Sequence, residues 1–174
     1  MGFDHYEPDT IERIGDQVAG YQVHTGNLSG ATYWGIGTQT EIFNVYGVVK
    51  VLNLFAEQLV IDGAPGATLL QFNFVSTTPT IARQNISGLS LTLATLVVGS
   101  RIVWLGNTVA TVPILTASGG ISDFSCVVPM VLGAVGGTGT IGTETTIAAA
   151  SAGTHRWSIF YLPMTEGSYV TNVL

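Results

Sequence analysis

Charged side chains are rare in this chain and are concentrated near its N-terminus. Residues 4–16 contain five of the eleven acidic residues and one of the five basic residues, whereas residues 17–174 contain only ten charged side chains. Charged residues make up 9% of the chain, against about a quarter in an ordinary soluble domain. The body has too few of them to cover a monomer's surface. This pattern predicts an outer surface that is covered by other protein chains or by lipid.

Length, charge and cysteine content narrow the class of protein. The 174 residues fit one domain with its own hydrophobic core. The single cysteine, Cys126, allows no intramolecular disulfide, and its apolar neighbours favour a core position. A net charge of −6 without any cluster of Lys or Arg argues against nucleic-acid binding.

Lipid is a poorer explanation than protein for the missing charge. The acidic N-terminus lacks the pattern of a secretory signal. The uncharged stretches 102–122 and 124–143 are interrupted by Gly and Pro, so neither predicts a membrane-spanning helix. A small outer-membrane barrel is also disfavoured, because paired girdles of aromatic residues are missing. We therefore expect no membrane partner.

The apolar pattern predicts strands rather than helices. The chain divides into an N-terminal arm, residues 1–30, and a body, residues 31–174, in which apolar residues alternate with a period of two. The clearest strand is 155–163, where Trp157, Ile159 and Tyr161 share one face. We expect an all-β fold, a single antiparallel β-sandwich or jelly-roll-like domain with an extended N-terminal arm.

Other segments give more local predictions. Residues 48–61 predict a long strand covered on both sides, in which strict alternation places Val49, Val51 and Phe55 on one face and Leu54 and Ala56 on the other. The turn residues that follow predict an antiparallel hairpin with the next apolar run, 68–75. The glycine-rich residues 133–142 predict a flexible turn or tip loop. Further short strands are expected at 90–96, 101–105, 109–115, 124–131, 138–141 and 145–149.

No pattern in the sequence predicts catalysis, a metal or a cofactor. The acidic arm holds possible cation ligands, but their spacing does not match a hard-cation loop. His24 and His155 lack neighbouring ligands for zinc. A Ser–His–acid triad stays open because its members can be distant in sequence, but there is no Gly-x-Ser-x-Gly elbow. We expect a protein that is not an enzyme.

Aromatic residues offer two kinds of site. Tyr33, Trp34, Trp104, Trp157 and Tyr161 could line a sugar site on a jelly roll, although core packing is favoured for Trp104 and Trp157. Tyr33 and Trp34, beside two glycines at the junction of arm and body, are expected to touch a partner. The predicted partner-contact residues are Phe3, Tyr6, Ile11, Ile14, Tyr33 and Trp34.

Two segments carry a family resemblance. Residues 153–170, with Trp157, Tyr161, Pro163 and Gly167, resemble the closing strand of small tailed-bacteriophage virion proteins, in which this ending follows a Gly/Thr-rich β body. Residues 42–52 resemble the opening strand pair of the same proteins. The resemblance implies a structural component of a phage particle.

Composition and resemblance together predict a non-enzymatic virion structural protein. The expected role is that of a capsid decoration or cement protein on the capsid surface. It would form a homo-oligomer, with a trimer favoured, and bind the major capsid protein or other virion proteins. No nucleic acid, membrane, metal or cofactor is expected. The alternatives are a tail or fibre-base component of the virion and a carbohydrate-binding jelly-roll module.

Overall fold

The computed structural model describes residues 20–29, 39–61, 63, 68–104, 114–116, 130–146 and 153–173. Within these residues the only helix is a single 3₁₀ turn, η1 (Leu93–Thr95), and all other regular elements are strands. The strands are β1 (Tyr21–His24), β2 (Leu28–Ser29), β3 (Thr40–Val60), β4 (Leu69–Thr78), β5 (Thr80–Asn85), β6 (Arg101–Trp104), β7 (Ile114–Thr116), β8 (Met130–Thr146), β9 (Thr154–Pro163) and β10 (Tyr169–Asn172). The predicted all-β class is confirmed.

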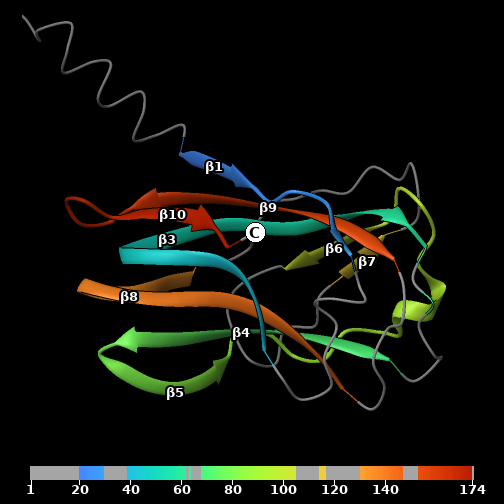
Figure 1. Cartoon of the computed structure of the whole chain (residues 1–174), viewed down its shortest axis with the longest axis horizontal. Coiled ribbons are helices and arrows are strands. Elements are labelled where there is room, and N and C mark those ends of the chain that lie inside the picture. The colour runs from blue at the N-terminus through green and yellow to red at the C-terminus, as the bar shows by residue number, and fades with distance from the viewer. Residues whose placement is uncertain are drawn as a thin grey trace, which may run out of the picture.

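The described strands form one antiparallel sheet of ten strands, organised around the long strand β3 (Figure 1). The main strand order is β1-β9-β3-β8-β4-β5. The first half of β3 lies between β8 and β10, and its second half lies between β9 and β6, with β7 beside β6. β3 therefore changes neighbours along its length, and the sheet divides into two branches.

The two branches pack against each other and enclose the core. Phe72 of β4 meets Trp157 of β9 edge to face, with ring centroids 5.6 Å apart at an interplanar angle of 89°, although β4 and β9 are not neighbours in the sheet. Trp104 of β6 is also buried, and its Nε1 donates a 2.9 Å hydrogen bond to the carbonyl oxygen of Ile86. Contact between non-neighbouring strands gives the predicted sandwich-like packing.

The hairpin expected between residues 48–61 and 68–75 is wrong. β8 lies between β3 and β4, so that Ile141 pairs with Phe43 on one side and with Phe74 on the other. Turn residues show that the chain reverses, but they do not determine which strand lies next to which. The middle of the strand that separates β3 from β4 is the glycine-rich segment 133–142, which the sequence predicts to be a turn or loop.

The glycine-rich residues 133–142 form the middle of β8 and not a tip loop. A β-carbon on Gly139 would lie 2.5 Å from Cζ of Phe74, and one on Gly142 would lie 2.4 Å from the carbonyl oxygen of Thr40. These glycines are needed because neighbouring groups occupy the space of a side chain. The strands predicted at 138–141 and at 145–149 are therefore one strand as far as Thr146, and residues 147–149 lie outside the described residues.

Strict alternation along β3 is also wrong, because a β-bulge interrupts it. The pairing of β3 with β9 shifts between Val51 and Asn53, which inserts one extra residue on β3. A bulge moves the following side chains to the opposite face. The buried face of β3 thus continues from Val49 and Val51 to Leu54, Ala56 and Gln58.

The predicted strand at 90–96 is wrong. Residues 86–93 run beside β4 and residues 99–100 bond to the end of β3, and the segment 86–100 has no strand geometry, its one regular element being η1. Its serine side chains replace ladder bonds, since Ser87 Oγ accepts from the backbone N–H of Phe72 at 2.9 Å and Ser90 Oγ accepts from that of Leu70 at 2.8 Å. Hydroxyl groups that bind the backbone compete with regular pairing. Among the other predictions, β6 matches 101–105 as far as residue 104, and only 114–115 of 109–115 and 130–131 of 124–131 lie in described strands. The strands β1, β2, β5 and β10 were not predicted.

The predicted strand 155–163 is confirmed as β9, with Pro163 as its last residue. Trp157, Ile159 and Tyr161 are buried on one face, as the alternation predicts. β9 pairs with the second half of β3, and both strands have neighbours on either side in the sheet.

Candidate functional site

The six residues predicted to contact partners, Phe3, Tyr6, Ile11, Ile14, Tyr33 and Trp34, lie outside the described residues. The same holds for Cys126 and for the acidic residues of the arm. Trp104, Trp157 and Tyr161 are buried in the core, as favoured for the two tryptophans, and so they provide no exposed platform for a sugar ring.

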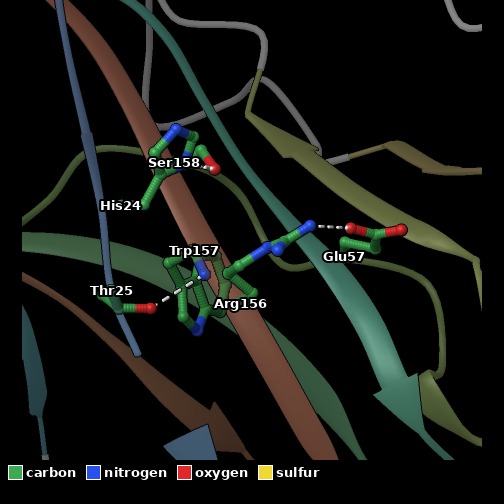
Figure 2. A network of polar contacts seen from close by, with 6 residues as sticks. All are labelled: His24, Thr25, Glu57, Arg156, Trp157 and Ser158. Atoms are coloured by element: carbon green, nitrogen blue, oxygen red, sulfur yellow. Dashed lines mark hydrogen bonds and ion pairs between the residues drawn. The ribbon is translucent and has the colours of Figure 1, made fainter. Parts of the chain in front are cut away.

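Polar side chains gather around the first half of β9 (Figure 2). His24 Nδ1 and Ser158 Oγ share a 2.7 Å hydrogen bond, and Thr25 Oγ1 accepts from the backbone N–H of Trp157 at 3.0 Å. The backbone N–H of Thr25 in turn donates to the carbonyl oxygen of Trp157 at 3.0 Å. Figure 2 shows His24 and Thr25 approaching β9 from the side of β1. These bonds fasten the end of β1 to β9.

The pairing of His24 with Ser158 does not build a hydrolytic site. Ser158 is only 3% exposed, so its hydroxyl is closed to a substrate. The nearby carboxylate of Glu57 accepts a 2.8 Å hydrogen bond from Nη2 of Arg156, in an ion pair that links β3 to β9. A triad needs a reachable hydroxyl and an acid that orients the histidine. This cluster is therefore structural.

His155, at the start of β9, is fully buried, with its ring centroid 6.4 Å from that of Trp157. Within the described ranges no group of three or more His, Cys, Asp or Glu residues is placed to hold a metal ion. His155 is thus a core residue that lies beside Trp157.

One buried carboxylate is matched by a basic side chain. Glu144 of β8 lies in an ion pair with Arg83 of β5, with 2.7 Å between Nη1 and Oε2. The glutamate side chain is almost completely buried, whereas the arginine is about one-third exposed. Because β4 separates β5 from β8 in the sheet, this pair connects two strands that share no ladder bonds. This ion pair, like the one between Glu57 and Arg156, therefore links two strands.

Exposed apolar side chains occur at the end of β3 and along residues 86–100. Two hydrogen bonds, from Gln58 N to Ser100 O at 2.9 Å and from Gly99 N to Gln58 O at 2.8 Å, hold this segment against β3. Residues 86–100 contain no charged side chain. We call this surface the apolar end, and its members are Val60, Ile61, Leu89, Leu91, Val97 and Val98.

The apolar end was not predicted residue by residue, although the sequence contains its signal. The uncharged run 86–100 is visible in the sequence, but the strand expected at 90–96 would have buried alternate residues. In the structure Leu91 is 70% exposed, and the neighbouring serines bind the backbone of β4. These apolar residues are exposed because the segment takes an irregular path and does not form the expected strand.

In the part of the chain that the structure describes, no helix is long and apolar enough to cross a membrane. A comparison of the chain with protein-family models, curated protein sequences and solved structures gave no match.

Proposed function

We propose that the protein is a non-enzymatic structural component of a tailed-bacteriophage particle, and specifically a decoration or cement protein that reinforces the capsid lattice. It would act as a homotrimer whose subunits cover one another's charge-poor surfaces. The N-terminal arm would attach the trimer to the major capsid protein or to another virion protein. A tail or fibre-base component is the runner-up.

The two segments that carry the family resemblance support this proposal by their position. Residues 42–52 lie in β3, and residues 153–170 contain β9 and the start of β10. β9 and β10 both pair with β3, from Thr154 opposite Val60 to Asn172 opposite Phe43. The resemblance therefore concerns the centre of one sheet and not two unrelated strands.

The apolar end is the observation that carries the proposal. Single exposed apolar residues are normal on a protein surface, but a contiguous group is typical of a contact with another chain. Leu91 and Val98 belong to a group of six such residues, four of which lie in the uncharged residues 86–100. A second copy of the chain, equally poor in charge, is the partner that fits this surface.

Charge introduced at the apolar end should disrupt the oligomer. The double variant Leu91→Glu, Val98→Glu is expected to weaken self-association at least about a hundredfold, because an unpaired carboxylate is costly to bury in an interface. Sedimentation velocity of the full chain at several concentrations measures this change. Val135→Glu is the matched control, since Val135 is 79% exposed in β8 outside the apolar end. A wild-type monomer, or a double variant that remains trimeric, would contradict this interface.

Copy number distinguishes a decoration protein from a tail component. A decoration protein that covers the lattice is expected at hundreds of copies per particle, because it repeats with the capsid subunits. Gel densitometry of purified particles, with the major capsid band as the internal standard, measures this number. A handful of copies per particle would support the tail or fibre-base alternative, and absence from purified particles would contradict both.

A further inference from the structure

An open cleft of about 620 Å³ lies between β1 and the segment that joins β9 to β10. Tyr21 of β1 forms one wall, and residues 163–168 form the other. The volume lies within the usual range of small-molecule sites, roughly 300–1,000 Å³, and far exceeds the space needed by a single ion. None of its lining residues belongs to the apolar end.

The wall opposite Tyr21 is formed by residues 164–168, which bulge out between β9 and β10 and are held to β3 by hydrogen bonds. We call these five residues the bulge. Pro163 pairs with Val49 and Tyr169 pairs with Tyr46, so residues 164–168 occupy a space that β3 spans with two residues. Both backbone groups of Val48 hold the bulge, since its carbonyl oxygen accepts from Met164 N at 2.8 Å and its N–H donates to Ser168 Oγ at 3.0 Å. The cleft is therefore largely formed before any ligand arrives.

A glycine next to this bulge allows it to lie close to β3. Gly47 has a φ of +69°, and a β-carbon on it would lie 2.3 Å from Oγ of Ser168. Any other residue would displace the serine that anchors the bulge. Glycine at position 47 thus provides both the positive φ and the space beside Ser168 that this wall requires.

The groups that line the cleft match the chemistry of a neutral sugar. Tyr21 is 47% exposed, and its ring is steadied by stacking on the buried ring of Tyr161, with centroids 5.7 Å apart. An exposed aromatic ring offers a surface for the C–H face of a pyranose. The carboxylate of Glu166 is exposed and can accept hydrogen bonds from two hydroxyl groups. Thr165 also lines the cleft, with its hydroxyl group hydrogen-bonded to Oγ of Ser168.

The charge of the lining excludes the main competing ligand classes. No Lys or Arg lines the cleft among the described residues, so a phosphate or carboxylate ligand would find no countercharge there and would be repelled by Glu166. A cation could pair with Glu166, but one aromatic wall does not form the cage that holds an ammonium group. We infer that this cleft binds a neutral saccharide, such as a disaccharide unit of a surface glycan. This site would add glycan adhesion to the structural role and does not depend on it.

Titration with a panel of neutral disaccharides tests this site. The probes are maltose, cellobiose, lactose and chitobiose, added to the full-length protein and followed by saturation-transfer difference NMR. At least one probe is expected to bind. Tyr21→Ala should weaken that binding about tenfold through loss of the stacking surface, and Glu166→Gln should weaken it several-fold through loss of the charged acceptor.

Tyr169→Ala is the matched control, because Tyr169 is 46% exposed and near the cleft but does not line it. This variant should bind the same disaccharide with unchanged affinity. Circular dichroism of each variant shows whether it is folded, and Tyr21→Phe keeps the ring if the alanine variant unfolds. Absence of signal from every probe would overturn the inference. Equal weakening by Tyr169→Ala and Tyr21→Ala would also overturn it, as would binding of an oligolysine peptide in place of the sugars.

Discussion

Replacement of Trp157 by alanine is expected to lower the free energy of unfolding by about 3–5 kcal/mol, the usual loss when a buried tryptophan is truncated. The side chain is fully buried on β9 and packs edge to face against Phe72 of β4. Because this contact joins the two branches of the sheet, its loss leaves a cavity between β4 and β9, two strands that do not pair with each other. Urea denaturation at a fixed protein concentration measures the change.

Tyr169→Ala provides the comparison for this measurement. Tyr169 stacks on Tyr46 with ring centroids 4.4 Å apart, but it is half exposed on the outer face of the sheet. Its truncation should lower the free energy of unfolding by no more than about 1.5 kcal/mol, the range of an aromatic pair. Similar losses for both variants would show that the contact between β4 and β9 is not central to the core.

Replacement of Gly133 by alanine is expected to be nearly as damaging, with a loss of about 3 kcal/mol, the upper end of the usual range for overpacking. The residue has a φ of +93°, and its β-carbon would lie 2.0 Å from the carbonyl oxygen of Gly47 on the adjacent strand β3. A backbone oxygen in the middle of a sheet cannot move away as a flexible side chain can. Thermal unfolding followed by circular dichroism measures the effect.

Gly136→Ala separates steric overlap from backbone strain. Gly136 also lies in β8 and has a φ of +65°, but no atom lies within 4 Å of its expected β-carbon. Only the conformational penalty of about 1–2 kcal/mol remains at this position. If Gly133→Ala loses no more stability than Gly136→Ala, the close approach of β8 to Gly47 is not maintained in solution.

The fold class and the central strand could be predicted from the sequence because their signals are local. Trp157, Ile159 and Tyr161 alternate over a run without a bulge, so the period of two predicts their common burial correctly. In β3 the same reasoning fails after Val51, where one inserted residue reverses the faces. A bulge depends on the partner strand, and the sequence of β3 alone does not encode it.

The strand order could not be predicted, because it depends on contacts between distant segments. The glycines of β8 predict a loop when only local flexibility is considered, but Gly139 and Gly142 make room for Phe74 and Thr40. This need arises only once β8 lies between β3 and β4. The misplaced hairpin and the misread glycine segment are therefore one error.

The candidate sites were predicted only in part. Low charge in the body predicts covered surfaces, but the apolar end requires the irregular path of residues 86–100 beside β4. The cleft requires the bulge at residues 164–168, and its signal in the sequence is Gly167 after Pro163, which also reads as an ordinary strand end. Both surface features form where regular strand pairing ends. The alternation of apolar and polar residues does not predict those points.

The central place of β3 also determines the order in which this chain can fold. β3 is synthesised before all the strands that flank it, and Phe43 pairs with Ile141, 98 positions later in the sequence. Among neighbouring strands, β4 with β5 and β6 with β7 are joined by shorter connections. Such long-range pairing makes folding slow, because the chain must close large loops before these contacts form. A nascent chain would therefore keep the first half of β3 without strand partners until β8 to β10 are made, and a ribosome-bound holding chaperone would be of most use in that interval.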